Sequence, residues 1–243
     1  MQTLNIILPV LNEEQCLAKN IHQIKTFLDS VSIPHYLTIV DNGSTDNTKI
    51  IAKKLCSQYT HIDYLSISQK GVGIALRKGI LHNLSRKNPC AFIGYMDIDL
   101  STNLAHLKKV YELLCGGEKI VVGSRLLKDS EVIGRSLKRE ITSRGLNLIL
   151  RFVLNTHFSD AMCGFKFYEI KTAQTITARC YDDNGWFYCA QMLIVAQYCR
   201  IPIREIPIVW RDDRHSKVKI ISLSLSYMRE IFRLFLIRIK GKL

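Results

Sequence analysis

The sequence lacks several features that would place it in common classes of protein. Its eight cysteines are scattered singly, and no two form a Cys-x-x-Cys pair, which argues against a zinc site and against a disulfide framework. No uncharged apolar run reaches membrane-spanning length, and the apolar segment 4–10 leaves no room for a signal peptide before it. No nucleic-acid-binding motif is present. These absences favour a reducing compartment and exclude nucleic acid as the expected partner.

Positive charge, in contrast, is abundant. The 243 residues carry a formal net charge of +13, and 47% of them are hydrophobic. A chain of this size and composition can bury a substantial core, as one good-sized domain or two small ones. The excess of lysine and arginine predicts an anionic partner, either a membrane surface or a phosphorylated substrate.

Strands and helices are expected to alternate through the first half of the chain. Apolar, β-branched segments near residues 4–10, 36–40, 62–67, 91–96 and 119–123 read as strands, and helical spacing lies between them. This alternation predicts an α/β fold with a mostly parallel, doubly wound sheet, whose ligands bind at the carboxyl ends of the strands. Asn12 is expected to cap the first helix.

Two acidic residues follow the fourth expected strand. Asp97 and Asp99 are spaced so that both carboxylates can turn toward one hard cation, which prefers oxygen ligands. Such a cation would in turn hold a diphosphate. An Asp-x-Asp pair by itself is more often two solvated loop acids, so the hypothesis depends on the rest of the chain.

The second half is rich in base. A helix expected over residues 136–154 places Arg139 and Ser143 one turn apart and carries a long apolar stretch. Cationic and apolar residues together suit a phosphate attached to a lipid, although a solvated basic helix has the same composition. The segment 218–243 has helical apolar spacing with many basic residues, so it either packs on the domain or lies in an anionic membrane interface.

With these motifs in order, the chain resembles the family 2 glycosyltransferases of GT-A fold, and most closely the polyprenyl-phosphate (dolichyl-phosphate) glucosyl- and mannosyltransferases. The ordered set covers nearly the whole chain: LPVLNEE, VDNGSTD, KGVG, MDIDLS, GSR, R-x-x-x-S, DAMCGFK, a Trp-led helix and W-R-D-x-x-x-SK. The resemblance implies a Rossmann-like, mostly parallel sheet sandwiched by helices, with a C-terminal amphipathic helix. We therefore expect a transferase domain over residues 1–217, followed by the basic amphipathic helix of residues 218–243, which its own composition predicts to lie in a membrane interface.

The resemblance also implies roles for individual residues. Asp97, Asp99 and Ser101 would approach a Mg²⁺ or Mn²⁺ ion. Arg125, Arg139 and Ser143 would hold the acceptor's phosphate, and Asp99, Arg125 and Arg139 are the expected catalytic residues. The nucleotide sugar would contact Pro9, Leu11, Glu13, Val40, Asn42, Asp97, Ile98, Asp99, Arg211 and Lys217.

The function implied is metal-dependent, inverting transfer of a hexose from a nucleotide sugar to a polyprenyl phosphate. UDP-glucose is the favoured donor and GDP-mannose the next. The enzyme would be cytoplasmic and peripheral on the inner face of a membrane, where an integral membrane protein is a further candidate partner. Two alternatives remain: a transferase acting on a soluble saccharide, and a nucleotide-sugar-binding module without activity. Asn42, Cys189 and Gln191 stand where the family commonly has acids, which keeps the second alternative open.

Overall fold

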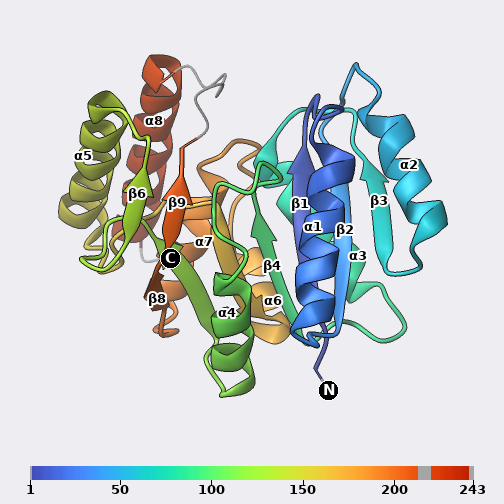
Figure 1. Cartoon of the computed structure of the whole chain (residues 1–243). Coiled ribbons are helices and arrows are strands. Elements are labelled where there is room, and N and C mark those ends of the chain that lie inside the picture. Colours follow the sequence, from blue (N-terminus) through green and yellow to red (C-terminus); the bar gives the residue numbers. More distant parts are fainter. Residues whose placement is uncertain (1, 213–219, 241–243) are drawn as a thin grey trace.

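A seven-stranded sheet forms the centre of the molecule (Figure 1). The structure, a computed structural model, describes residues 2–212 and 220–240, with side chains from residue 225 onward in the second segment. The strand order is β3-β2-β1-β4-β7-β5-β8, and β7 alone runs antiparallel to its neighbours. The strands are β1 (Leu4–Val10), β2 (His35–Asp41), β3 (Ile62–Ser66), β4 (Phe92–Met96), β5 (Ile120–Ser124), β7 (Phe165–Glu169) and β8 (Arg204–Pro207).

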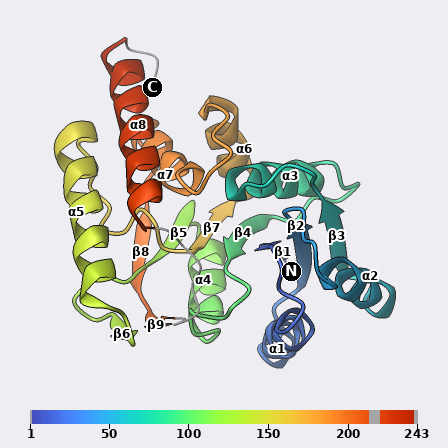
Figure 2. The same ribbon diagram turned by 90° about the horizontal axis from the view of Figure 1, so that it is seen from above.

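Helices cover both faces of the sheet, as Figure 2 shows from above. Alternate residues of β1 enter opposite cores: Ile7 belongs to one apolar cluster, whereas Ile6 and Leu8 belong to the other. Strands buried on both faces are typical of parallel sheets, so the expected α/β sandwich is confirmed. One layer contains α3 (Val72–Leu84), α6 (Ile170–Arg179) and α7 (Tyr188–Tyr198); the other contains α1 (Leu17–Ser30), α2 (Thr48–Gln58) and α4 (His106–Cys115).

A smaller unit lies beside the β8 edge of the sheet. It contains β6 (Glu131–Ile133), which pairs with β9 (Val209–Arg211), and the two helices α5 (Leu137–Leu154) and α8 (Ile220–Ile239). These helices lie side by side in both views (Figures 1 and 2). Tyr227, Ile231 and Leu234 of α8 are buried in the cluster that also contains α7, so α8 has one face packed on the domain.

The reversed strand β7 determines what lies beside the end of β4. Met96, the last residue of β4, pairs with Phe165, the first residue of β7. Continuing this antiparallel register by one residue sets Asp97 opposite Gly164. The segment that precedes β7 is therefore brought against the first acid of the Asp-x-Asp pair.

Candidate active site

The acid pair lies at the carboxyl end of β4, as the sequence predicts. All five residues of β4 are buried, whereas Asp97 is partly exposed and Asp99 is exposed. The chain turns sharply here, since Leu100 has a left-handed φ of 58°. The backbone N–H of Ser101 donates to Asp99 Oδ1 over 2.9 Å, which fixes the second carboxylate. Ile98 points away from this edge, into the core.

The charges around Asp97 suit a divalent cation. Burial and the neighbouring Asp99 carboxylate raise the pKa of Asp97 to about 7, against the opposing effect of Arg125 and Lys166. Two like charges this close favour a shared cation, and carboxylate oxygens are the ligands that Mg²⁺ and Mn²⁺ accept. Among the described residues no group of three His, Cys, Asp or Glu side chains forms a metal cage. An ion here would take its remaining ligands from water and from phosphate oxygens, which is common for Mg²⁺.

The loops after β1 and β2 lie beside this edge and lock together. Asn12 adopts a left-handed φ of 57°, receives a bond from the Thr45 N–H over 2.8 Å and donates its own N–H to Ser44 Oγ over 3.0 Å. Glu14 accepts from the backbone and side chain of Asn47. Asn12 is therefore not the cap of the first helix, which begins at Leu17; that prediction was wrong, because bonds to the second loop determine its conformation.

The residues expected to contact the nucleotide divide into two groups. Leu11, Glu13 and Asn42 lie in these loops, and the buried Asn42 Oδ1 has no hydrogen-bond partner among the described residues. Glu13 also influences the charge of Asp97, which places it near the metal-site acids. Pro9 is partly exposed in β1. The side chains of Val40 and Ile98, in contrast, are enclosed in the two cores. Any contact with a nucleotide at these two positions would have to involve the main chain.

Arg125 is already paired with an acid. Its Nε and one terminal nitrogen donate to the two oxygens of Asp160 over 2.7 and 2.9 Å, and its backbone N–H donates to the same carboxylate. Although burial opposes the charge, Arg125 lowers the pKa of Asp160 to about 2. The guanidinium also lies over the ring of Trp210, 4.9 Å from its centroid. This geometry makes Arg125 a fixed cation rather than a free one.

Arg139 pairs in turn with Asp212. One terminal nitrogen of Arg139 lies 2.6 Å from both carboxylate oxygens, and the two side chains are 24% and 13% exposed. Ser143, one helical turn away, has a buried hydroxyl without a partner among the residues described. An unsatisfied hydroxyl beside an exchangeable arginine suits an incoming phosphate oxygen.

The segment after β8 completes this side of the site. Arg211 in β9 is exposed, and its N–H donates to the Ser101 carbonyl over 2.8 Å. Thr102 forms a bridge with Trp210, so β9 lies directly against the turn that contains the acids. Lys217, expected to close over the donor, lies outside the described residues.

Several residues that the sequence did not single out contribute to this region. Gly164 lies against Asp97, since a Cβ built at position 164 would be 2.1 Å from Asp97 Oδ2. Lys166 is entirely buried; its ammonium donates to the Tyr95 hydroxyl over 3.1 Å and to the Cys163 carbonyl. Burial and the nearby Arg125 lower the pKa of Arg135, and one terminal nitrogen of Arg135 donates to the Arg139 carbonyl over 3.5 Å. The DAMCGFK motif marks Gly164 and Lys166, but their contacts depend on the antiparallel pairing of β7.

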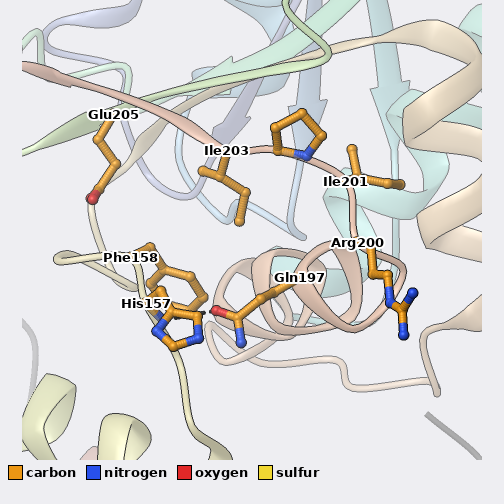
Figure 3. Close-up of a pocket in the computed structure, with 8 residues that line it drawn as sticks. His157, Phe158, Gln197, Arg200, Ile201, Ile203 and Glu205 are labelled. Carbon is orange, nitrogen blue, oxygen red and sulfur yellow. Dashed lines mark hydrogen bonds between the residues drawn. The ribbon is translucent and has the colours of Figure 1, made fainter.

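A separate cavity of about 300 Å³ lies beside β8, lined by residues that include His157, Gln197 and Glu205 (Figure 3). Gln197 accepts a bond from the His157 N–H over 2.8 Å, and Glu205 accepts from the backbone and hydroxyl of Ser159. None of the expected site residues lines it. Because these polar groups already have partners, the cavity gives no indication of a ligand.

The fold is that of the GT-A class of glycosyltransferases. The chain belongs to glycosyl transferase family 2, whose family model matches residues 5–176. It is 29% identical to a dolichyl-phosphate beta-glucosyltransferase of Dictyostelium discoideum, over 95% of this chain and 73% of the relative. The human protein of the same name is 26% identical, over 88% of this chain and 69% of the relative.

Two further similarities are more limited. Glycosyltransferase AglD of Haloferax volcanii is 28% identical over 94% of this chain, but the chain spans only 36% of that protein. Glucosyl-3-phosphoglycerate synthase of Mycobacterium tuberculosis, solved with Mn²⁺, UDP and glucosyl-3-phosphoglycerate, superposes with a TM-score of 0.68. The superposition covers 98% of this chain and 79% of that one at 18% identity. It therefore supports the fold alone.

Proposed function

We propose that the chain transfers a hexose, with glucose from UDP-glucose favoured and GDP-mannose the next donor, to a polyprenyl phosphate with inversion at the anomeric carbon. The observation that carries the proposal is the similarity over nearly the full chain to dolichyl-phosphate beta-glucosyltransferases. The paired acids at the end of β4 and the arginines around Ser143 support it, because they provide separate places for a diphosphate and a phosphate.

The chain's own residues would divide the work between donor and acceptor. Asp97 and Asp99, with Ser101 nearby, would hold Mg²⁺ or Mn²⁺, which when bound supplies positive charge to the diphosphate. The two interlocked loops after β1 and β2 would bind the nucleoside, where the unpartnered Asn42 Oδ1 can accept a bond from a base N–H.

The acceptor would bind by exchange at Arg139. Its phosphate would replace the Asp212 carboxylate and bond to the Ser143 hydroxyl, while Arg125 stays fixed by Asp160 and contributes its field. A phosphate oxygen already carries negative charge at neutral pH, so it can attack the anomeric carbon without strong general-base help. The new oxygen–carbon bond forms as the bond to the nucleoside diphosphate breaks on the opposite face, which inverts the configuration. Holding both reactants in line supplies much of the acceleration.

The proposed location is the cytoplasmic face of a membrane, as a peripheral protein. All eight cysteines are free, which suits a reducing compartment. No helix in the described part of the chain has the length and apolar character needed to cross a bilayer. The proposed lipid acceptor lies in a membrane, and an integral membrane protein is a further candidate partner.

The test is transfer of radiolabelled sugar into an organic-extractable polyprenyl phosphate, comparing UDP-glucose, UDP-N-acetylglucosamine and GDP-mannose with and without chelator. Label that enters the lipid phase from UDP-glucose and is lost with chelator is the expected result. Asp99→Ala should abolish transfer, whereas Arg139→Ala should raise the acceptor KM far more than the donor KM. Donor binding without lipid label would favour a soluble acceptor, and neither binding nor transfer would favour an inactive module.

A further inference from the structure

An exposed apolar stripe runs along α5 on the side away from the protein. Leu137, Ile141, Leu148 and Phe152 recur at helical spacing, and Phe152 is 78% exposed. The opposite side of the same helix carries Leu150 and Leu154, which are fully buried. The helix packs on the protein through the side that carries Leu150 and Leu154. The outer stripe is therefore available to bind a partner or a membrane.

The neighbouring helix α8 has the same construction. Its inner side contributes Tyr227, Ile231 and Leu234 to the core, whereas Met228, Phe232, Leu236 and Ile239 are exposed in a second stripe. The two helices are in contact, since one terminal nitrogen of Arg238 donates to the Val153 carbonyl over 3.0 Å. Figures 1 and 2 show them at one end of the molecule, beside the edge of the sheet. We call these two stripes the α5–α8 surface.

The charges beside both stripes are positive. Arg144 and Arg151 are exposed on α5, Arg229 and Arg233 are exposed on α8, and Lys240 is exposed directly after α8. Each helix contains a single acidic residue. Glu140 is bound by Arg135 and Arg144, and Glu230 is buried beneath Arg229 and the Tyr181 hydroxyl. Arg144, Arg229 and Arg233 are thus ion-paired, whereas Arg151 and Lys240 have no acidic partner among the described residues. The five cations outnumber the two acids, so the exposed apolar side chains lie beside a net positive charge.

We infer that the α5–α8 surface docks on a lipid bilayer that contains anionic lipids. Amphipathic helices with apolar residues between rows of lysine and arginine lie in membrane interfaces, where burial and charge both contribute. Charge decides against a second copy of this chain, because a self-complementary interface would bring the same cations face to face. The purpose of docking, which is access to a lipid acceptor, rests on the proposed function. The binding to the bilayer is argued from the exposed residues alone.

The position of the acceptor site on α5 gives docking a purpose. Arg139 and Ser143 lie on the inner side of α5, the side that also carries Leu150 and Leu154. Along the helix, Ser143 follows Arg139 by about one turn, and Leu150 follows Arg139 by about three turns. The helix that would rest on the bilayer thus also carries the proposed phosphate-binding residues. A polyprenyl phosphate, whose chain stays in the bilayer, would reach Arg139 with its headgroup without leaving the membrane.

The experiment is flotation of the full chain with vesicles of phosphatidylcholine alone or with 30% phosphatidylglycerol, at low and high salt. Ile141→Ser/Phe152→Ser should lower the vesicle partition coefficient roughly tenfold or more. The matched control is Ile50→Ser/Leu81→Ser, which removes two exposed apolar residues on α2 and α3 (66% and 55%, against 70% and 78% for Ile141 and Phe152) and should bind as the wild type does. Circular dichroism melts establish that both double variants are folded.

A second pair of variants tests the charge. Arg151→Gln/Lys240→Gln should weaken binding to anionic vesicles about 25-fold at low salt, from about fivefold for each cation. Lys49→Gln/Lys53→Gln on α2 removes the same net charge and should have little effect. Added salt should reduce wild-type binding, since it screens the attraction.

Three outcomes would overturn the inference. The first is unchanged vesicle binding by the Ile141/Phe152 variant, and the second is equal binding to neutral and anionic vesicles. The third is a wild-type dimer, seen in light scattering, that this variant dissociates. That result would show that the surface binds a second copy of the chain. Transfer in detergent to a short-chain polyprenyl phosphate separates the two proposals. If the wild type fails there but binds vesicles as described, the proposed function is wrong and the docking surface stands.

Discussion

Gly164→Ala should remove metal-dependent activity while leaving the fold intact. Gly164 precedes β7 and Asp97 follows β4, so the paired strands hold the two backbones face to face. A Cβ at position 164 would lie 2.1 Å from Asp97 Oδ2, 2.6 Å from its Cγ and 2.8 Å from Oδ1. The φ of Gly164 is not in the left-handed region, so the effect of an alanine is steric rather than conformational.

The size of the displacement follows from these contacts. Real Cβ contacts are rarely closer than 3.0 Å, so the carboxylate has to move by about 1 Å. Metal–ligand distances tolerate only about 0.2 Å, and a misplacement of about 1 Å in an active site can cost about 100-fold in rate. Overpacking should cost about 1–3 kcal/mol in the free energy of unfolding, which leaves the domain folded at assay temperature.

The measurements are Mn²⁺ binding by calorimetry and sugar transfer at saturating donor, each with a thermal melt. Gly145→Ala is the control, because a Cβ built there has no atom within 4 Å apart from its chain neighbours and the backbone of its own helix. In that helical position alanine should raise stability by up to about 1 kcal/mol and leave activity unchanged. Turnover by Gly164→Ala within threefold of the wild type would refute the assignment of Asp97 to the metal site.

Further predictions concern the two arginine pairs. Asp160→Asn should destabilise the protein by about 3–5 kcal/mol at pH 7, as measured by denaturant unfolding, because it leaves the buried Arg125 without a counter-charge. Since the pKa of Asp160 is about 2 in the folded state and near 4 when unfolded, its contribution of about 2–3 kcal/mol should be complete above about pH 5 and lost as the pH falls through about 2. A wild-type unfolding profile that is flat over this range would contradict the pairing. Asp212→Asn should lower the acceptor KM about five- to tenfold, because it removes the carboxylate that competes for Arg139; an unchanged acceptor KM would show that Arg139 does not receive the phosphate.

Much of the sheet could be predicted from the sequence, because its strands are local patterns. The apolar segments that end at Val10, Asp41 and Met96 each precede polar loops, and parallel strands bring their carboxyl ends to one edge. The position of β7 could not be predicted in this way. It follows β5 in the chain but lies between β4 and β5 in the sheet, and only tertiary pairing determines that order.

Local preference also failed where distant bonds compete with it. Asn12 has the side chain of a helix cap, yet Ser44 and Thr45, 32 and 33 residues away, bind it in a left-handed turn. These bonds occupy the side chains of Asn12 and Ser44, which the sequence alone would leave available to a nucleotide. A count of polar residues at a strand end therefore overestimates the groups that are available to a ligand.

The two arginine pairs extend this point, because the sequence treats Arg125 and Arg139 alike. Asp160 holds Arg125 through three bonds in a buried setting, and separating that pair would strand a charge. Asp212 holds Arg139 through one nitrogen, in a pair that solvent reaches. A phosphate can replace the second carboxylate at little cost, but not the first. We therefore expect Arg125 to set the field of the site and Arg139 to bind the acceptor, a division of roles that only the partners' depth of burial reveals.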